Sequence, residues 1–204
     1  MKKEAPNPAQ INANSALSKM PTILLMRSGR TAWETEGRIQ GALEIPLSPE
    51  GLAEIEQRAK EIKERVERTI FCGADLAAVQ SAQAVGRACG GRVKPLKELR
   101  EMRLGLWEGL LETEALRRNP TAYRLWRKDP LSACPPSGES AEECHGRVSE
   151  GLRRLAAHDG DRPTVLVCSR LIAAMVRCRV KDVPVSRLWE YVMPPAAAEM
   201  LQLR

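Results

Sequence analysis

Residues 22–26 read TILLM, an uninterrupted apolar run that ends at the polar sequence Arg27-Ser28-Gly29. A short apolar run without alternation indicates a strand that is buried on both faces of a sheet. The runs TIFC at 69–72 and TVLVC at 164–168 have the same character. Strands of this kind, separated by segments with helical periodicity, predict a mainly parallel sheet.

The segments between these runs carry helix signals. Ser48 followed by Pro49 predicts a helix start, because the serine oxygen caps free backbone N–H groups and proline fits the first turn. We expect helices at about 48–67, 76–89 and 139–157, helices between 107 and 128, and a closing strand after Pro195. The predicted fold class is α/β, a three-layer sandwich in which helices cover both faces of a mostly parallel sheet.

The length of 204 residues fits one domain. We expect residues 21–204 to form that domain. Residues 1–20 are rich in Asn, Ser, Ala and Pro, and we expect a disordered or loosely attached extension there. Hydrophobic residues make up 43% of the chain and charged residues 28%, a balance that excludes global disorder.

The location of the protein is inferred from its apolar runs and its cysteines. No stretch approaches the roughly 18 apolar residues that a membrane span requires, and no apolar run follows the basic N-terminus. The six cysteines form no CxxC pair and fit no zinc spacing. We therefore expect a cytoplasmic protein with reduced, structural thiols, no metal, no cofactor and no membrane partner.

The net charge of +6 favours anionic partners without naming them. Basic clusters occur at 117–118, 124–128 and 177–181. Acidic residues are interspersed among them, however, and no aromatic stacking platform or reading motif accompanies them. Nucleic-acid binding is therefore a less favoured function for this chain than the two described below.

Ligands of parallel α/β sheets bind at the carboxyl ends of the strands. The loops after 22–26 and 164–168 are therefore the places to look for a site. Several motifs follow one another from the first of these loops onward. They are Arg27-Ser28-Gly29-Arg30-Thr31-Ala32-Trp33, Gly37-Arg38-Ile39-Gln40-Gly41, Pro46-Leu47-Ser48-Pro49-Glu50-Gly51, Leu99-Arg100-Glu101-Met102, Gly105-Leu106-Trp107-Glu108-Gly109, Ser137-Gly138-Glu139-Ser140 and Val165-Leu166-Val167-Cys168-Ser169.

In this order the motifs resemble the histidine phosphatase superfamily, in its phosphoglycerate mutase-like branch. That family reads Arg-His-Gly-Glu-Thr, an aromatic residue, Gly-Arg-x-Gln-Gly and Pro-Leu-Ser-x-x-Gly, and later Ser-His-Gly at a strand end. The resemblance covers residues 22–204. It implies the phosphoglycerate mutase-like fold and a phosphatase or mutase site.

The resemblance also implies a reaction that this sequence does not support. In the family a neutral histidine attacks phosphorus, arginines and a second histidine neutralise the phosphoryl oxygens, and a glutamate protonates the leaving oxygen. Here Ser28 occupies the position of the nucleophilic histidine. Arg170 occupies the position of the second histidine, and Ala78 that of an arginine in the pocket. Leu171 and Ile172 replace the glycines after the second histidine. Arg27, Thr31 and Glu101 are retained.

Neither of the two histidines replaces the missing ones. His145 falls in the middle of a predicted helix and His158 at its end. A serine at position 28 needs a base, and the neighbouring arginines stay charged. We therefore expect no catalytic residues and a catalytically inactive pseudophosphatase. The alternative is an active phosphomonoesterase that uses Ser28 as its nucleophile.

A pocket for anions is expected even without catalysis. The resemblance assigns ligand binding to residues that gather at the strand ends: Arg27, Ser28, Thr31, Arg38, Glu101 and Arg170. Such a pocket suits a phosphorylated small molecule or an inorganic anion. In the other reading Leu171 and Ile172 fill the pocket, Arg170 pairs with Glu101, and the partner is a protein.

Overall fold

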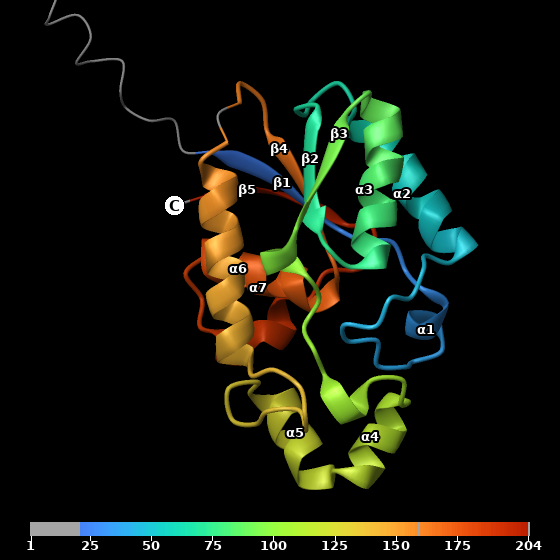
Figure 1. Cartoon of the computed structure of the whole chain (residues 1–204), viewed down its shortest axis with the longest axis vertical. Coiled ribbons are helices and arrows are strands. Elements are labelled where there is room, and N and C mark those ends of the chain that lie inside the picture. Colours follow the sequence, from blue (N-terminus) through green and yellow to red (C-terminus); the bar gives the residue numbers. More distant parts are fainter. Residues whose placement is uncertain (1–20, 159, 204) are drawn as a thin grey trace, which may run out of the picture.

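The computed structural model describes residues 21–158 and 160–203 (Figure 1), so the expected N-terminal extension, residues 1–20, lies outside the described residues. A five-stranded sheet has the strand order β3-β2-β4-β1-β5. Its strands are β1 (Thr22–Arg27), β2 (Thr69–Gly73), β3 (Arg92–Leu96), β4 (Thr164–Cys168) and β5 (Ala198–Gln202). All neighbours pair in parallel except β5, which runs antiparallel to β1. The predicted mostly parallel sheet is confirmed.

Two hydrophobic clusters pack against opposite faces of the sheet. Along β1, Ile23 and Leu25 belong to one cluster, and Leu24 and Met26 belong to the other. The first cluster includes helices α6 (Ala141–Ala156) and α7 (Arg170–Val180), and the second includes α2 (Pro49–Ile62) and α3 (Leu76–Cys89). This arrangement confirms the predicted three layers, and it explains why the central strands lack polar alternation.

The helix ends follow local capping chemistry. The Ser48 hydroxyl accepts a hydrogen bond from the Gly51 N–H, which starts α2 as predicted. Gly90 ends α3 in the left-handed conformation, with φ of 62°. The α2 helix ends at Ile62, five residues before the expected end. Beyond it the chain turns, and the Glu67 N–H donates to the Pro163 carbonyl next to β4.

The remaining helices lie at one end of the sheet. They are α1 (Ala32–Thr35), α4 (Glu112–Arg118), α5 (Pro120–Lys128) and the 3₁₀ segments η2 (Lys97–Leu99), η3 (Gly105–Trp107) and η4 (Val185–Tyr191). Figure 1 shows α4 and α5 as a lobe below the layered body. None of the helices in the described part of the chain has the length and apolar character of a membrane span.

Aromatic side chains connect this lobe to the body. Trp126 of α5 meets Trp189 of η4 edge to face, with ring centroids 4.6 Å apart, and Trp107 contacts Tyr123 in the same way at 5.3 Å. The Trp189 N–H donates to the Trp126 carbonyl at 3.0 Å. Such pairs add to the stabilisation from burial, so Trp107 and Trp189 pack the lobe onto the body.

Candidate anion-binding cleft

A cleft opens at the carboxyl ends of β1 and β4, where ligands of α/β sheets bind. The parallel register places Arg27 beside Cys168, so the chain leaves both strands at the same edge. The empty volume of the cleft is about 680 Å³, part of it open to solvent. It is lined by all six residues predicted to bind a ligand: Arg27, Ser28, Thr31, Arg38, Glu101 and Arg170.

Arg27 is the last residue of β1 and is buried. Its Nη1 donates to the Met193 carbonyl at 2.5 Å, and its Nη2 forms an ion pair with Glu34. Its Nε has no hydrogen-bond partner. Burial lowers the pKa of Arg27, the Glu34 carboxylate opposes that change, and the nearby Arg170 lowers the pKa further. Arginine keeps its charge in proteins, so Arg27 and Arg170 supply two of the positive charges in the cleft.

Ser28 is held by its backbone. Its N–H donates to the Cys168 carbonyl at 2.8 Å, and its carbonyl accepts from the Ala196 N–H at 3.3 Å. Within residues 21–158 and 160–203, its hydroxyl has no hydrogen-bond partner. Neither histidine lines the cleft. His145 lies on α6, and His158 packs against the Phe71 ring with centroids 5.3 Å apart.

Arg170 is the first residue of α7 and is half-exposed. Its Nη1 lies 3.7 Å from the Glu112 Oε1 on α4, and its Nε is buried without a partner. The suggested pairing of Arg170 with Glu101 is wrong. The Glu101 oxygens instead accept hydrogen bonds from the N–H groups of Met102 at 2.7 Å and Leu171 at 2.9 Å.

Glu101 is a buried acid in the wall of the cleft. Burial raises its pKa to about 7, the nearby Asp75 raises it as well, and the two backbone N–H donors and Arg147 lower it. The side chain holds the first turn of α7, where the helix dipole favours negative charge. Glu101 is therefore both a titratable group of the cleft and a cap for the helix.

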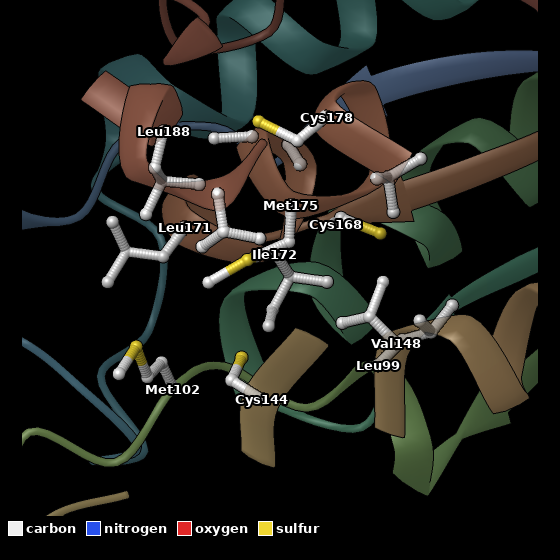
Figure 2. Close-up of a cluster of buried hydrophobic side chains, with 14 of the residues drawn as sticks. Leu99, Met102, Cys144, Val148, Cys168, Leu171, Ile172, Met175, Cys178 and Leu188 are labelled. Atoms are coloured by element: carbon white, nitrogen blue, oxygen red, sulfur yellow. The ribbon is translucent and has the colours of Figure 1, made fainter. Parts of the chain in front are cut away.

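The two residues after Arg170 have different positions. Ile172 is completely buried, and Figure 2 shows it in the apolar cluster with Met175. Leu171 belongs to the same cluster and also forms part of the cleft wall. The reading in which both side chains fill the pocket is wrong, because Ile172 turns into the core and a cleft remains.

The alanine that faces the cleft is Ala77, not Ala78. The Asp75 carboxylate caps α3 by accepting from the Ala78 N–H at 3.1 Å, and the Ala78 side chain is buried in the cluster with α2. Neighbouring residues of a helix point in different directions, so a shift of one position moves a side chain from the cleft to the core.

Thr31 and Arg38 line the cleft and also hold its loops. The Thr31 hydroxyl caps α1 by accepting from the Glu34 N–H at 3.2 Å, and it donates to Gln40 at 3.0 Å. Arg38 donates to Glu36 at 2.7 Å and to the Gly109 carbonyl at 3.0 Å. These bonds show that Arg38 and Gln40 hold the loops around the cleft together.

Sequence reasoning missed several lining residues. They come from α1 and the α4–α5 lobe: Glu34, Glu112, Tyr123, Trp126 and Arg127. The Arg127 guanidinium lies 4.2 Å from the centroid of the Trp189 ring. The sequence predicts helices between 107 and 128 but not their place beside the strand ends.

The sheet and its strand-end cleft define an α/β protein whose ligand site is built from the loops after β1 and β4. The chain belongs to the histidine phosphatase superfamily (branch 1), whose family model matches residues 23–204. This match confirms the family that the motifs indicated.

Known proteins of several activities are similar to this chain. Phosphoglycerate mutase-like protein 4 of Arabidopsis thaliana is 29% identical over 157 residues, which cover 75% of this chain and 68% of that protein. Glucosyl-3-phosphoglycerate phosphatase of Mycolicibacterium vanbaalenii is 28% identical over 188 residues, or 89% of this chain and 83% of that protein.

Solved structures share the fold. YhfR of Bacillus stearothermophilus superposes with a TM-score of 0.83 at 23% identity, over 88% of this chain and 90% of that one. A mycobacterial glucosyl-3-phosphoglycerate phosphatase solved with inorganic phosphate superposes with a TM-score of 0.78 at 26% identity, over 88% of each chain.

Proposed function

We propose that this protein is a catalytically inactive member of the histidine phosphatase superfamily whose cleft binds inorganic phosphate or a phosphorylated small molecule. The observation that carries the proposal is the composition of the cleft. Ser28 and Arg170, which the motif resemblance places at the two family histidine positions, both line it, and neither His145 nor His158 does.

The loss of catalysis follows from the groups around Ser28. A serine hydroxyl attacks phosphorus only when a base or a metal activates it. Arg27 and Arg170 cannot accept its proton. Both Glu101 oxygens accept backbone hydrogen bonds, and in the described part of the chain the Ser28 hydroxyl contacts no base by a hydrogen bond. Without a base, no phosphoenzyme forms at this position.

Retained binding is supported by unpaired hydrogen-bond donors. Among the described residues, four buried side-chain polar atoms lack a partner, and three of them are the Nε atoms of Arg27 and Arg170 and the Nε1 of Trp126. All three side chains line the cleft. An unsatisfied buried donor costs about 1–3 kcal/mol, so this cleft suits a ligand that is rich in acceptor oxygens.

The charge of the cleft also suits an anion. Four arginines and three glutamates line it: Arg27, Arg38, Arg127, Arg170, Glu34, Glu101 and Glu112. Charge-assisted hydrogen bonds from guanidinium groups to phosphate are among the strongest polar contacts in proteins. The solved relative that holds inorganic phosphate supports the same ligand chemistry for this fold.

The test combines calorimetric titration with inorganic phosphate and an assay of p-nitrophenyl phosphate hydrolysis. We expect binding without turnover. Arg170→Ala should weaken phosphate binding about tenfold, because it removes a charged donor. Arg87→Ala is the matched control: Arg87 also faces a glutamate at 3.7 Å, but on α3 and away from the cleft.

Two results would contradict the proposal. Turnover in the wild type that disappears in Ser28→Ala would establish the alternative, an active phosphomonoesterase with a serine nucleophile. Absence of phosphate binding, or equal weakening by Arg170→Ala and Arg87→Ala, would exclude the cleft as an anion site and would direct the search to protein partners.

A further inference from the structure

Glu34 places a carboxylate inside a cleft that is otherwise suited to anions. The residue belongs to the short helix α1, which Thr31 caps, and it lines the cleft. Its Oε1 accepts from the Arg27 Nη2. Its Oε2 has no hydrogen-bond partner within the described residues, and the side chain is 27% exposed. A free carboxylate oxygen therefore lies beside the most deeply buried arginine of the cleft.

The position of Arg27 makes this oxygen important for any ligand. Arg27 already donates hydrogen bonds from Nη1 to the Met193 carbonyl and from Nη2 to Glu34, and its Nε has no hydrogen-bond partner. Glu34 is held on this same guanidinium and lines the same cleft, so an anion that binds Arg27 lies near the Glu34 carboxylate. An unprotonated oxygen of the ligand and the Glu34 carboxylate repel each other when they are close, and the repulsion is stronger in a partly buried site than in water.

A proton on the ligand removes this conflict. A phosphate or phosphomonoester with one protonated oxygen has a P–OH group, which donates a hydrogen bond to the free Glu34 oxygen. Its remaining oxygens still accept from Arg27 and Arg170. Sulfate has the same shape and carries no proton near neutral pH, so it offers Glu34 only a repulsive contact. One acidic side chain is sufficient to separate the two anions.

We infer that Glu34 is a specificity-determining residue, which makes the cleft select a protonated phosphate or phosphomonoester and reject anions, such as sulfate, that have no proton to donate. This inference rests on the proposed function, because it names the form of the anion that the proposed cleft takes. Glu34 acts by direct contact with the ligand and has no part in catalysis.

Calorimetric titration with inorganic phosphate and with sulfate tests the inference, at equal ionic strength and about pH 6. At this pH every inorganic phosphate ion carries at least one proton, and sulfate carries none. We expect the wild type to bind phosphate at least about tenfold more tightly than sulfate, as is typical when a charged hydrogen bond is lost. Glu34→Gln offers sulfate an N–H donor, so we expect the preference to fall to within about threefold, chiefly through tighter sulfate binding.

Glu61→Gln is the matched control. It removes one carboxylate from an exposed ion pair with Arg58 on α2, away from the cleft, and should keep the preference for phosphate. Circular dichroism checks that the variants fold. The comparison of the two anions in the wild type needs no variant, so the inference stays testable if Glu34→Gln does not fold.

The outcomes separate this inference from the function on which it rests. Equal binding of phosphate and sulfate by the wild type, or an unchanged preference in Glu34→Gln, overturns the role of Glu34 and leaves the anion site standing. Sulfate binding that occurs in Glu34→Gln alone supports the role of Glu34. Failure of all three proteins to bind either anion overturns the anion site, and the inference with it.

Discussion

The backbone N–H of Leu171 donates a hydrogen bond to the Oε2 of Glu101, at 2.9 Å. Glu101 follows η2, and Leu171 lies in the first turn of α7, seventy positions later in the chain. A buried acid of the cleft thus satisfies one of the free N–H groups of a helix that begins beside the strand ends. The Glu101 side chain therefore contributes both to the stability of the first turn of α7 and to the charge of the cleft.

The first prediction concerns the pH dependence of stability. Burial raises the pKa of Glu101 from 4.5 to about 7, so between these values the folded protein holds a proton that the unfolded chain has lost. The contribution of Glu101 to the free energy of unfolding therefore falls as pH rises through this window, by roughly 3 kcal/mol in total. Glu101→Gln cannot titrate and should lack this fall.

Urea denaturation of the wild type and Glu101→Gln at several pH values between about 5 and 8 measures this difference. The variant should be less stable at low pH, because its amide group cannot accept from one of the two N–H donors. The gap should narrow as pH rises. A constant difference in the free energy of unfolding across this range would show that Glu101 does not titrate there.

The strands and most helix boundaries could be predicted from the sequence because local physics sets them. Continuous apolar runs marked β1, β2 and β4, and Ser48 marked the start of α2 by its capping chemistry. The end of α2 was missed, because the contact of Glu67 with Pro163 joins segments far apart in the chain. No local pattern encodes such a contact.

Some residues of the site could also be predicted from the sequence, and others could not. Arg27, Ser28 and Arg170 could be placed from the sequence, because residues that follow parallel strands meet at one edge of the sheet. Glu34 and Arg127 could not, because their positions depend on how α1 and the α4–α5 lobe pack over that edge. The cleft is lined by Ala77, whereas the sequence pointed to Ala78. The rotation of α3 about its axis decides which residue faces the cleft, and sequence spacing fixes this rotation only to within one residue.

The second prediction compares two glycines of the segment between β1 and α2. An added Cβ at Gly29 would lie 2.4 Å from the Gly51 carbonyl oxygen, whereas at Gly37, with φ of +72°, it would meet nothing within 4 Å. Gly29→Ala therefore forces backbone to move and should cost about 3 kcal/mol or more. Gly37→Ala should cost about 1 kcal/mol, from its left-handed backbone alone. Similar urea midpoints for the two variants would contradict the packing of Gly29 against Gly51.

The third prediction separates the two apolar residues of α7 that follow Arg170. Ile172 has no exposed surface, so Ile172→Ala leaves a cavity in the core and should cost about 2–5 kcal/mol. Leu171 borders the cleft, so the space left by Leu171→Ala joins the cleft, and the loss should be smaller. Calorimetric titration with a bulky phosphomonoester should show tighter binding for Leu171→Ala only. Tighter binding for Ile172→Ala would mean that Ile172 borders the cleft.

The fourth prediction concerns the ion pair between Arg170 and Glu112. The two side chains are 40% and 43% exposed and lie 3.7 Å apart, so their mutual stabilisation should be below about 1 kcal/mol. A double-mutant cycle with Arg170→Ala and Glu112→Gln, followed by urea denaturation, measures this coupling energy. A larger coupling would show that the pair is a structural link between α7 and α4.

The same pair bears on ligand binding. Glu112→Gln removes the carboxylate that faces Arg170, so the arginine meets less competition for its donors, and phosphate should bind several-fold more tightly. Added salt should weaken phosphate binding in both proteins, and the advantage of the variant should shrink as ionic strength rises. An advantage that persists at about 1 M salt would instead indicate that Glu112→Gln changes the shape of the cleft.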